Sequence, residues 1–254
     1  MLDIIYLTKN RLEFTKASFE TLLKNTDWSL VQRLLIFDDA STDGTRNYLL
    51  KKFIELPLPY GVRMGFHDNQ KYGSPAAVTL AYIQKHDPAP LFVKLDNDVI
   101  VPPEWLNRVH AVMLTHPELH FLGIEPPNSR VPHFENRGTR SPQPENDPQY
   151  AAQSFAPCNS IGGIGAMRTE VFLKYSADLL PHSIYGGFTE WQLKHREINK
   201  GWINPPLDVF LLDRMPVEPW LSLSARYIRE GNQRAWSRYP LDNPYWSWWE
   251  QPNV

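Results

Sequence analysis

The first half of the chain alternates short apolar runs with segments of helical periodicity. The apolar runs have strand length and are Leu2 to Leu7, Leu34 to Phe37, Val62 to His67 and Leu91 to Leu95. The helical segments extend over Leu12 to Asn25, from Ser41 or Thr42 to Phe53, over Ala76 to Gln84 and over Trp105 to Met113. This order predicts an α/β fold with a mostly parallel central sheet, right-handed crossovers and helices on both faces.

A polar turn follows each of the predicted strands. The carboxyl ends of parallel strands meet at one edge of a sheet, and open α/β sheets bind their ligands there. We therefore expect Thr8, Asp39, Asn69 and Asp98 to gather in one crevice.

The turn after the strand at Leu91 to Leu95 contains the sole D-x-D pattern of the chain, Asp96-Asn97-Asp98. Carboxylates two residues apart on extended backbone point to the same side. Cations of the magnesium class are typically held by one or two carboxylates together with substrate phosphates. A metal site is one interpretation of this pair, and an ordinary surface turn is the other.

Length and composition limit the class of protein. The 254 residues fit one large α/β domain. A net charge of −2 gives no basic field, so we expect no nucleic-acid partner. The single Cys158 excludes an internal disulfide framework and a cysteine zinc cluster. No apolar run approaches the roughly 20 residues of a membrane span, so we expect a cytoplasmic protein for which peripheral membrane contact stays open.

The second half of the chain is less regular. Proline-rich Glu125 to Tyr150 predicts a long loop of the kind that serves as a lid or binding loop. The other predicted elements are a strand at Phe121 to Ile124, a glycine-rich segment at Ile161 to Met167, a helix from about Thr169, a helix at Thr189 to Lys200 capped by Gly201, a strand at Val209 to Leu212 and an aromatic tail from Arg226 to Val254.

Five sequence motifs of this chain, taken together and in their order along the chain, indicate a family. They are the first strand with Thr8-Lys9-Asn10-Arg11, IFDDASTDGT from Ile36 to Thr45, VKLDND with VPPEW, GGIGAMR from Gly162 to Arg168 and TEWQLKHR from Thr189 to Arg196. Together they resemble the GT-A glycosyltransferases of family 2 over roughly residues 1 to 205. The aspartate pair followed by S-T-D-G-T is the most specific part. TEWQLKHR is similar to the E-D-x-x-L-x-x-R helix of the family's acceptor side.

The resemblance implies a Rossmann-like GT-A fold and the transfer of one sugar from a nucleotide-diphosphate donor. A UDP-sugar is favoured as donor, a manganese or magnesium ion as cofactor, and inversion as outcome. The acceptor would be a glycan, a lipid-linked compound or another hydroxyl, in bacterial glycan or glycoconjugate synthesis. The single domain of residues 1–254 would then comprise a nucleotide-sugar half (1–115), an acceptor half (116–215) and an aromatic extension (216–254).

The resemblance also implies a role for individual residues. Those on the donor side are Thr8 and Arg11 in the nucleotide pocket, Asp39 at the base, Asn69 and Lys71 beside the nucleotide, Asp96 near the ribose or sugar, and Gly162 and Gly163 near the donor sugar. Asp98, with Asp96, would hold the metal. Glu190 would be the general base, and Trp191 and Trp246 would lie on the acceptor side.

Elementary chemistry agrees with these roles. A leaving nucleoside diphosphate develops negative charge, which a metal across its phosphates stabilises as a Lewis acid. The acceptor hydroxyl must lose its proton, and a carboxylate within reach contributes about 10²- to 10⁴-fold. We assign Asp38 a structural role and Lys94 none.

Three positions depart from the family pattern. Thr189 stands where the family has its first helix acid, so an acceptor contact can differ. Many members supply a late histidine to the metal, but the last histidine is His195, which leaves Asp213 or water as candidates. Gln233 to Trp236 resembles the Q-x-x-R-W signature of processive synthases with different spacing, so single-sugar transfer is expected.

Two rival functions are kept as alternatives. A sugar nucleotidyltransferase shares the fold and the metal but needs a glycine-rich phosphate loop after its first strand, and here no glycine precedes Gly44. The same absence argues against a dinucleotide-binding dehydrogenase. A non-catalytic nucleotide-sugar-binding protein is the other rival. The base also stays open, because thymine presents the same polar edge as uracil and guanine is not excluded.

Overall fold

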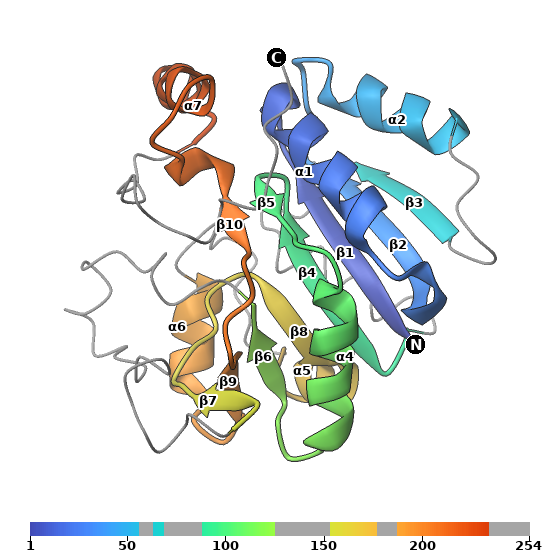
Figure 1. Ribbon diagram of the computed structural model, residues 1–254, viewed down its shortest axis with the longest axis vertical. Coiled ribbons are helices and arrows are strands. Elements are labelled where there is room, and N and C mark those ends of the chain that lie inside the picture. The colour runs from blue at the N-terminus through green and yellow to red at the C-terminus, as the bar shows by residue number, and fades with distance from the viewer. Residues whose placement is uncertain (56–62, 69–87, 125–152, 177–186, 234–254) are drawn as a thin grey trace.

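The computed structural model describes residues 1–55, 63–68, 88–124, 153–176 and 187–233. Within them, an eight-stranded sheet has the order β3-β2-β1-β4-β8-β6-β9-β7 (Figure 1). Its strands are β1 (Leu2–Thr8), β2 (Val31–Asp38), β3 (Arg63–Asp68), β4 (Leu91–Asp96), β6 (Phe121–Gly123), β7 (Phe155–Pro157), β8 (Gly165–Arg168) and β9 (Lys200–Ile203). Only β8 and β7 pair antiparallel with their neighbours among these described strands, which confirms the mostly parallel sheet.

Helices cover both faces of the sheet, as predicted. One face carries α1 (Leu12–Asn25), α2 (Thr45–Glu55) and α4 (Trp105–Thr115), and the other carries α5 (Thr169–Tyr175) and α6 (Gly187–Lys194). β1 runs between the two layers, with Ile4 and Tyr6 in one core cluster and Ile5 and Leu7 in the other. A strand buried on both faces needs a continuous apolar run, which is why this segment does not alternate.

The register of the sheet brings the polar strand ends together. Thr8 of β1 pairs with Asp38 of β2, and Leu7 of β1 pairs with Asp96 of β4. The last residues of three adjacent parallel strands therefore meet at the carboxyl edge of the sheet, where ligands of open α/β folds bind.

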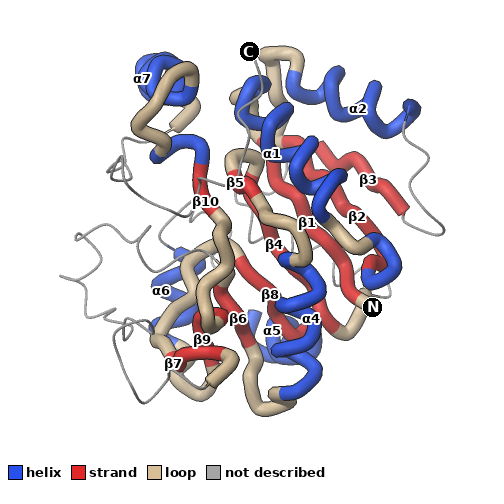
Figure 2. The backbone as a smooth tube through the Cα atoms, viewed as in Figure 1, coloured by secondary structure: helices blue, strands red, loops and turns tan. Residues whose placement is uncertain are grey.

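A second, two-stranded sheet returns the end of the chain to this edge. Its strands, β5 (Val99–Ile100) and β10 (Phe210–Leu211), pair antiparallel. The short 3-10 helix η7 (Leu212–Arg214) follows, and the N–H of Leu212 donates to the carbonyl of Asp98 at 2.9 Å. Both strands lie beside the main sheet in the tube view (Figure 2).

Helix α7 (Trp220–Arg229) is an element that the sequence analysis missed. Its aromatic side chains pack against Phe14 of α1, with ring centroids 5.0 Å away for Tyr227 and 5.9 Å for Trp220. The segment is short and mixed in composition, so this packing, rather than local propensity, accounts for the helix. A further 3-10 helix, η1, spans Trp28–Leu30.

Two predicted helix boundaries are wrong. The helix expected over Thr189 to Lys200 ends at Lys194, and Gly201 belongs to β9 rather than to a helix cap. A Cβ at Gly201 would lie 2.5 Å from a ring carbon of Phe155, so the glycine allows close approach of β7. Helix α2 begins at Thr45, whose N–H donates to the carboxylate of Asp43 at 3.0 Å.

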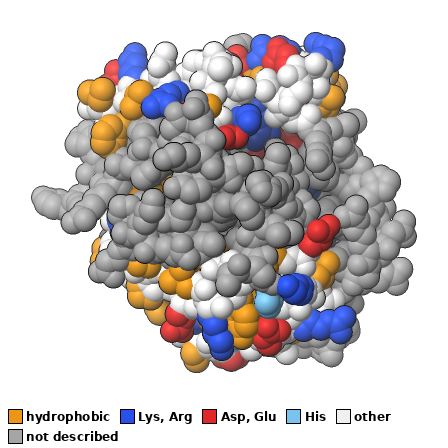
Figure 3. Space-filling model, turned by 180° about the vertical axis from the view of Figure 1, so that it is seen from behind, with side chains coloured by type: hydrophobic (Ala, Val, Ile, Leu, Met, Phe, Trp, Pro, Cys, Tyr) orange, Lys and Arg blue, Asp and Glu red, His pale blue; other side chains and the backbone are white. Residues whose placement is uncertain are grey.

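Several predictions lie outside the described residues. These are the helix at Ala76 to Gln84, the loop at Glu125 to Tyr150 and most of the aromatic tail. The division into a nucleotide-sugar half, an acceptor half and an extension stays a prediction. No helix within the described ranges is long and apolar enough to cross a membrane. On the face drawn in Figure 3, basic and acidic side chains of the described residues are interspersed.

Candidate functional site

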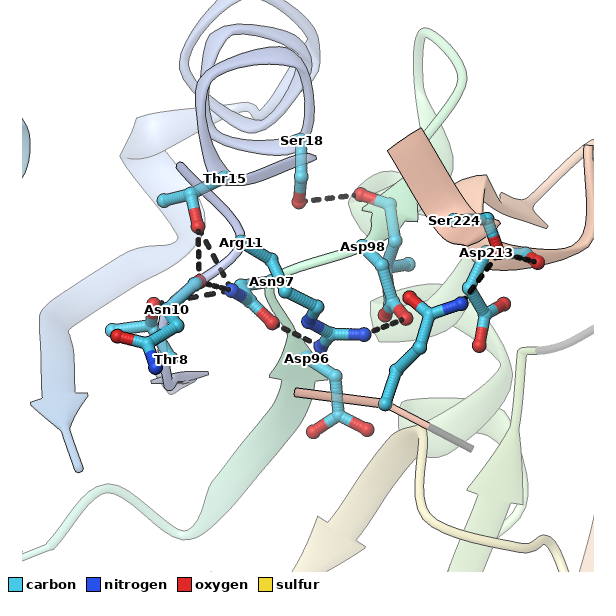
Figure 4. A network of polar contacts seen from close by, with 12 residues as sticks. Thr8, Asn10, Arg11, Thr15, Ser18, Asp96, Asn97, Asp98, Asp213 and Ser224 are labelled. Carbon is cyan, nitrogen blue, oxygen red and sulfur yellow. Dashed lines mark hydrogen bonds and ion pairs between the residues drawn. The ribbon is translucent and has the colours of Figure 1, made fainter. Parts of the chain in front are cut away.

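The turn between β1 and α1 has an unusual backbone. Asn10 and Arg11 both adopt left-handed conformations, with φ of 50° and 64°. Positive φ is uncommon for residues other than glycine, and such strain tends to cluster at functional sites. The side chain of Arg11 points toward the D-x-D segment (Figure 4).

Arg11 is held by the D-x-D segment. Its Nη1 forms an ion pair with Asp98 Oδ2 at 2.9 Å, and its Nη2 donates to Asn97 Oδ1. Asn97 is buried, and its amide nitrogen donates to the carbonyl of Asn10 at 2.8 Å and to Thr8 Oγ1 at 3.2 Å. The middle residue of D-x-D therefore anchors the β1–α1 turn and keeps the guanidinium beside Asp98.

The carboxyl of Asp98 lies in an unusual electrostatic environment. Burial raises its pKa, and the charge of Asp96 acts in the same direction. The guanidinium of Arg11 opposes that rise, and Arg214 contributes in the same sense as Arg11. A buried carboxyl with a raised pKa, next to the carboxyl edge of a sheet, is a marker of a functional site.

Asp96 engages a different cation. Lys94 Nζ lies 2.8 Å from Asp96 Oδ1 and 2.8 Å from the carbonyl oxygen of Gly163. The side chain of Lys94 is 8% exposed, whereas that of Asp96 is 36% exposed, so Lys94 is largely buried and Asp96 reaches solvent. The expected extended backbone through both acids is wrong, since β4 ends at Asp96 and Asn97-Asp98 form a turn.

The aspartate pair after β2 divides into a buried and an accessible member. Asp38 is buried, and its Oδ2 accepts from the N–H of Ser41 at 3.1 Å, which fits the structural role assigned to it. Asp39 is one-third exposed and pairs with Lys9 at 2.9 Å. The N–H of Asp39 donates to the carbonyl of Thr8 at 2.8 Å, which brings both donor-side candidates together.

The glycine pair and the candidate base are joined by Gln192. This side chain is fully buried, and its amide donates to the carbonyl of Gly162 at 2.8 Å. It also accepts from the N–H of Ile161 at 2.9 Å. Glu190 lies in the first turn of the same helix, α6, and is exposed.

Trp191, which the resemblance assigns to the acceptor side, is largely buried. It is 5% exposed, stacks on Phe188 and Phe121, and donates its indole N–H to the carbonyl of Tyr175 at 2.8 Å. A helix that packs on a sheet must bury one side, and Trp191 is on that side of α6. Asn69, Lys71 and Trp246 lie outside the described residues.

The match to known families decides the classification. A family model described as "Glycosyl transferase family 2" matches residues 3–175. The chain belongs to that family. This classifies it among the glycosyltransferases, as the sequence predicts. No curated protein sequence matches the chain.

Solved structures show the same fold for this family 2 member. S. aureus TarS 1-349 in complex with UDP-GlcNAc superposes with a TM-score of 0.57 at 12% identity, over 81% of this chain and 56% of that one. GalNAc-T7 with UDP, GalNAc and Mn²⁺ gives 0.55 at 13%, over 80% and 41%. The Pyrobaculum calidifontis mannosyltransferase PcManGT with GDP-Man and Mn²⁺ gives 0.55 at 14%, over 81% and 54%. At these identities the likeness shows the GT-A fold alone, and the chain spans about half the length of these structures.

The carboxylates of the D-x-D segment suit a hard divalent cation. Asp96 and Asp98 supply carboxylate oxygens, the ligand type that magnesium and manganese prefer. Among the described residues, no group of three or more histidine, cysteine, aspartate or glutamate side chains is arranged to hold a metal. Asp213 lies near Asp98 because η7 begins beside it (Figure 4), yet it does not complete such a group. Donor phosphates or water would supply the remaining ligands.

Sequence reasoning missed three polar residues of this site, namely Lys94, Asn97 and Gln192. A signal existed for Lys94, because it precedes Asp96 by two residues on β4 and so shares its face. Asn97 and Gln192 bind backbone groups from distant segments, and their own neighbours in sequence do not reveal those partners.

Proposed function

We propose that this glycosyltransferase moves a single sugar from a nucleotide-diphosphate sugar, with UDP-sugar favoured, to the hydroxyl of an acceptor, with inversion. A glycan, a lipid-linked compound or another hydroxyl compound would be the acceptor, in bacterial glycan or glycoconjugate synthesis. The observation that carries the proposal is the pair Asp96 and Asp98 at the carboxyl edge of a family 2 fold, one carboxylate reaching solvent and one buried beside Arg11.

The proposed donor site lies at the ends of β1, β2 and β4. Thr8 and Asp39 are linked through the backbone and lie at the carboxyl edge of the sheet, where a nucleotide is expected. UDP occurs in the TarS and GalNAc-T7 complexes and GDP-mannose in PcManGT, so the fold accepts more than one base. The carboxylate of Asp39 suits the N3–H of uracil, for which reason UDP is favoured, and thymine presents the same N3–H.

We assign a divalent cation to Asp96 and Asp98. Two relatives of this fold contain Mn²⁺. When bound, the ion would supply Lewis-acid stabilisation of the leaving diphosphate. Arg11 and Lys94 each engage one oxygen of these carboxylates, which fixes the two groups while the donor complex binds.

On the acceptor side, we assign Glu190 the removal of the hydroxyl proton. It lies in the first turn of α6. A single displacement at the anomeric carbon, with the proton passing to this carboxylate, gives inversion. Glu190 is exposed, so its carboxylate is accessible for this role.

A donor screen tests this function. The purified chain is incubated with UDP-, GDP- and dTDP-sugars and with Mn²⁺ or Mg²⁺, and released nucleoside diphosphate is measured with and without simple hydroxyl acceptors. We expect release that depends on one class of donor. In a parallel incubation with a nucleoside triphosphate and a sugar phosphate, release of pyrophosphate would favour the nucleotidyltransferase. Saturable binding of a nucleotide-sugar without any release would favour the non-catalytic binding protein.

Replacing Asp39 with alanine tests the nucleotide side. The variant should bind free nucleoside diphosphate more weakly by about 1–3 kcal/mol, the usual cost of leaving a buried hydrogen-bond partner unpaired. Its exposed ion pair with Lys9 contributes little to stability, so the fold should survive. Titration calorimetry measures the affinity, and Lys9→Ala is the matched control for loss of the ion pair alone. Equal affinity of Asp39→Ala and the wild type would remove Asp39 from the nucleotide site.

A further inference from the structure

We propose that Lys94 and Gln192 are positioning residues, which together clamp the loop of residues 160–163 between Asp96 and the helix that carries Glu190. The inference rests on the proposed function, since it takes Asp96 as a donor-side acid and Glu190 as the acceptor-side base. It assigns a role to two buried polar side chains, Lys94 and Gln192.

Lys94 forms the donor-side half of the clamp. It lies on β4 two residues before Asp96, so both side chains project from the same face of the sheet. Its ammonium bonds the Asp96 carboxylate and the Gly163 carbonyl, both at 2.8 Å. The side chain of Lys94 is 8% exposed, and a charged group is costly to bury without partners, so these bonds hold the loop against the end of β4.

Gln192 forms the acceptor-side half. Its amide group bonds two consecutive residues of the same loop, accepting from the N–H of Ile161 and donating to the carbonyl of Gly162. The side-chain amide thus bonds the loop as the backbone of a neighbouring strand would, through one N–H and one carbonyl. Gly162 adopts a φ of 67°, a conformation that glycine tolerates without strain, and this turn directs successive carbonyls to Gln192 and Lys94.

The orientation of α6 follows from this contact. Residues two apart on a helix lie roughly 200° apart around its axis. Gln192 is fully buried and Glu190 is exposed, so the bonds of Gln192 to the loop determine the direction in which Glu190 points. A continuous path thus runs from the Asp96 carboxylate through Lys94, the loop and Gln192 to the candidate base.

Such a path matters because the two acids come from different elements and must act on one donor–acceptor pair. A misplacement of about 1 Å at a reacting group can cost about 10²-fold in rate. A loop anchored on both sides keeps the spacing of the two acids fixed. Loss of either anchor should therefore reduce the rate of transfer while the nucleotide still binds.

The test uses the full chain with Lys94→Met, Gln192→Leu and the double variant. Arg168→Met is the matched control, because Arg168 also holds backbone carbonyls, those of Met113 and Leu119, at the opposite end of the β4–β8 pair. Gln192→Leu should lower kcat for transfer about 10- to 100-fold and raise donor hydrolysis relative to transfer. Its dissociation constant for free nucleoside diphosphate should stay within about threefold, a split that a general loss of structure does not produce.

The double variant decides whether the two side chains act as one device. Because they hold the same loop, its kcat should be no more than about threefold below that of the slower single variant. If the fold loss of kcat in the double variant equalled the product of the losses in the two single variants, the two side chains would act independently and the clamp would be overturned. Losses in Arg168→Met as large as those in Gln192→Leu would also overturn it.

Hydrogen exchange gives a readout that does not depend on activity. In Gln192→Leu the amide of Ile161 should exchange faster, while the Arg168→Met control keeps its protection. Unchanged protection in Gln192→Leu would overturn the clamp even if the chain transfers sugar. If the wild-type chain releases nucleoside diphosphate from no donor, the proposed function fails, and the exchange result still decides whether Gln192 holds the loop.

Discussion

Replacing Asp98 with asparagine should lower kcat/KM for transfer by about 10³-fold or more, the scale seen when a preorganised electrostatic group is lost. Asparagine keeps the size of the side chain and an oxygen that accepts from Arg11, but removes the negative charge that a divalent cation needs. The buried guanidinium of Arg11 would keep a hydrogen bond to residue 98, so the variant should fold. Alanine would be a poorer choice, because breaking a buried ion pair on one side typically costs about 3–5 kcal/mol.

Two measurements separate a metal role from a general effect. Manganese binding, followed by electron paramagnetic resonance in the presence of nucleoside diphosphate, should weaken strongly in Asp98→Asn. A chelator should reduce wild-type transfer and leave the residual rate of the variant unchanged. Asp27→Asn is the matched control, since Asp27 precedes β2 at the amino edge of the sheet and caps η1. If Asp98→Asn transferred sugar in metal-free buffer at the wild-type rate, the site would not need this carboxylate.

The sequence predicts the sheet well because burial on both faces imposes a strong pattern. Apart from Asp3, β1 is apolar from Leu2 to Leu7, and every residue of the strand is buried. The same logic predicts which turns meet, since parallel strands must end at a common edge. Of the four residues expected in one crevice, Thr8 contacts Asp39 and the D-x-D segment that contains Asp98, whereas Asn69 lies outside the described residues.

The polar network was beyond sequence reasoning for a physical reason. Lys94 bonds a carbonyl 69 residues away, and Asn97 bonds the carbonyl of Asn10 across 87 residues. Local propensity contains no information on such partners, and lysine is rarely buried in proteins, so the sequence analysis assigns Lys94 no role.

The wrong end of α6 has a similar origin. The segment after Lys194 has helical composition, but its backbone turns and enters β9 at Lys200. There the amino group of Lys200 bonds the carbonyls of His195 and Ile198, both at 2.7 Å. Tertiary bonds to the turn thus outweigh helix propensity, which is worth only a few tenths of a kcal/mol for most residues, about 0–0.7.

Replacing Glu190 with glutamine should reduce kcat for transfer by about 10²- to 10⁴-fold, the usual contribution of a general base. Glutamine matches the size of the side chain but cannot accept the proton of the attacking hydroxyl at neutral pH. Because Glu190 is exposed, the substitution should change stability by no more than about 0.5 kcal/mol. Affinity for nucleoside diphosphate should also be unchanged, since the residue lies on the acceptor side of the proposed site.

Glu170→Gln is the matched control, because Glu170 is an exposed glutamate in the first turn of α5, on the same face of the sheet. That variant should transfer at the wild-type rate, whereas Glu190→Gln should bind donor normally and accumulate product slowly. Single-turnover measurements at saturating donor and acceptor isolate the chemical step from product release. A wild-type single-turnover rate in Glu190→Gln would assign the proton to another group. Glu190 would then serve only to complement the dipole of α6. A general base cannot be replaced by an amide without loss of the group that accepts the proton.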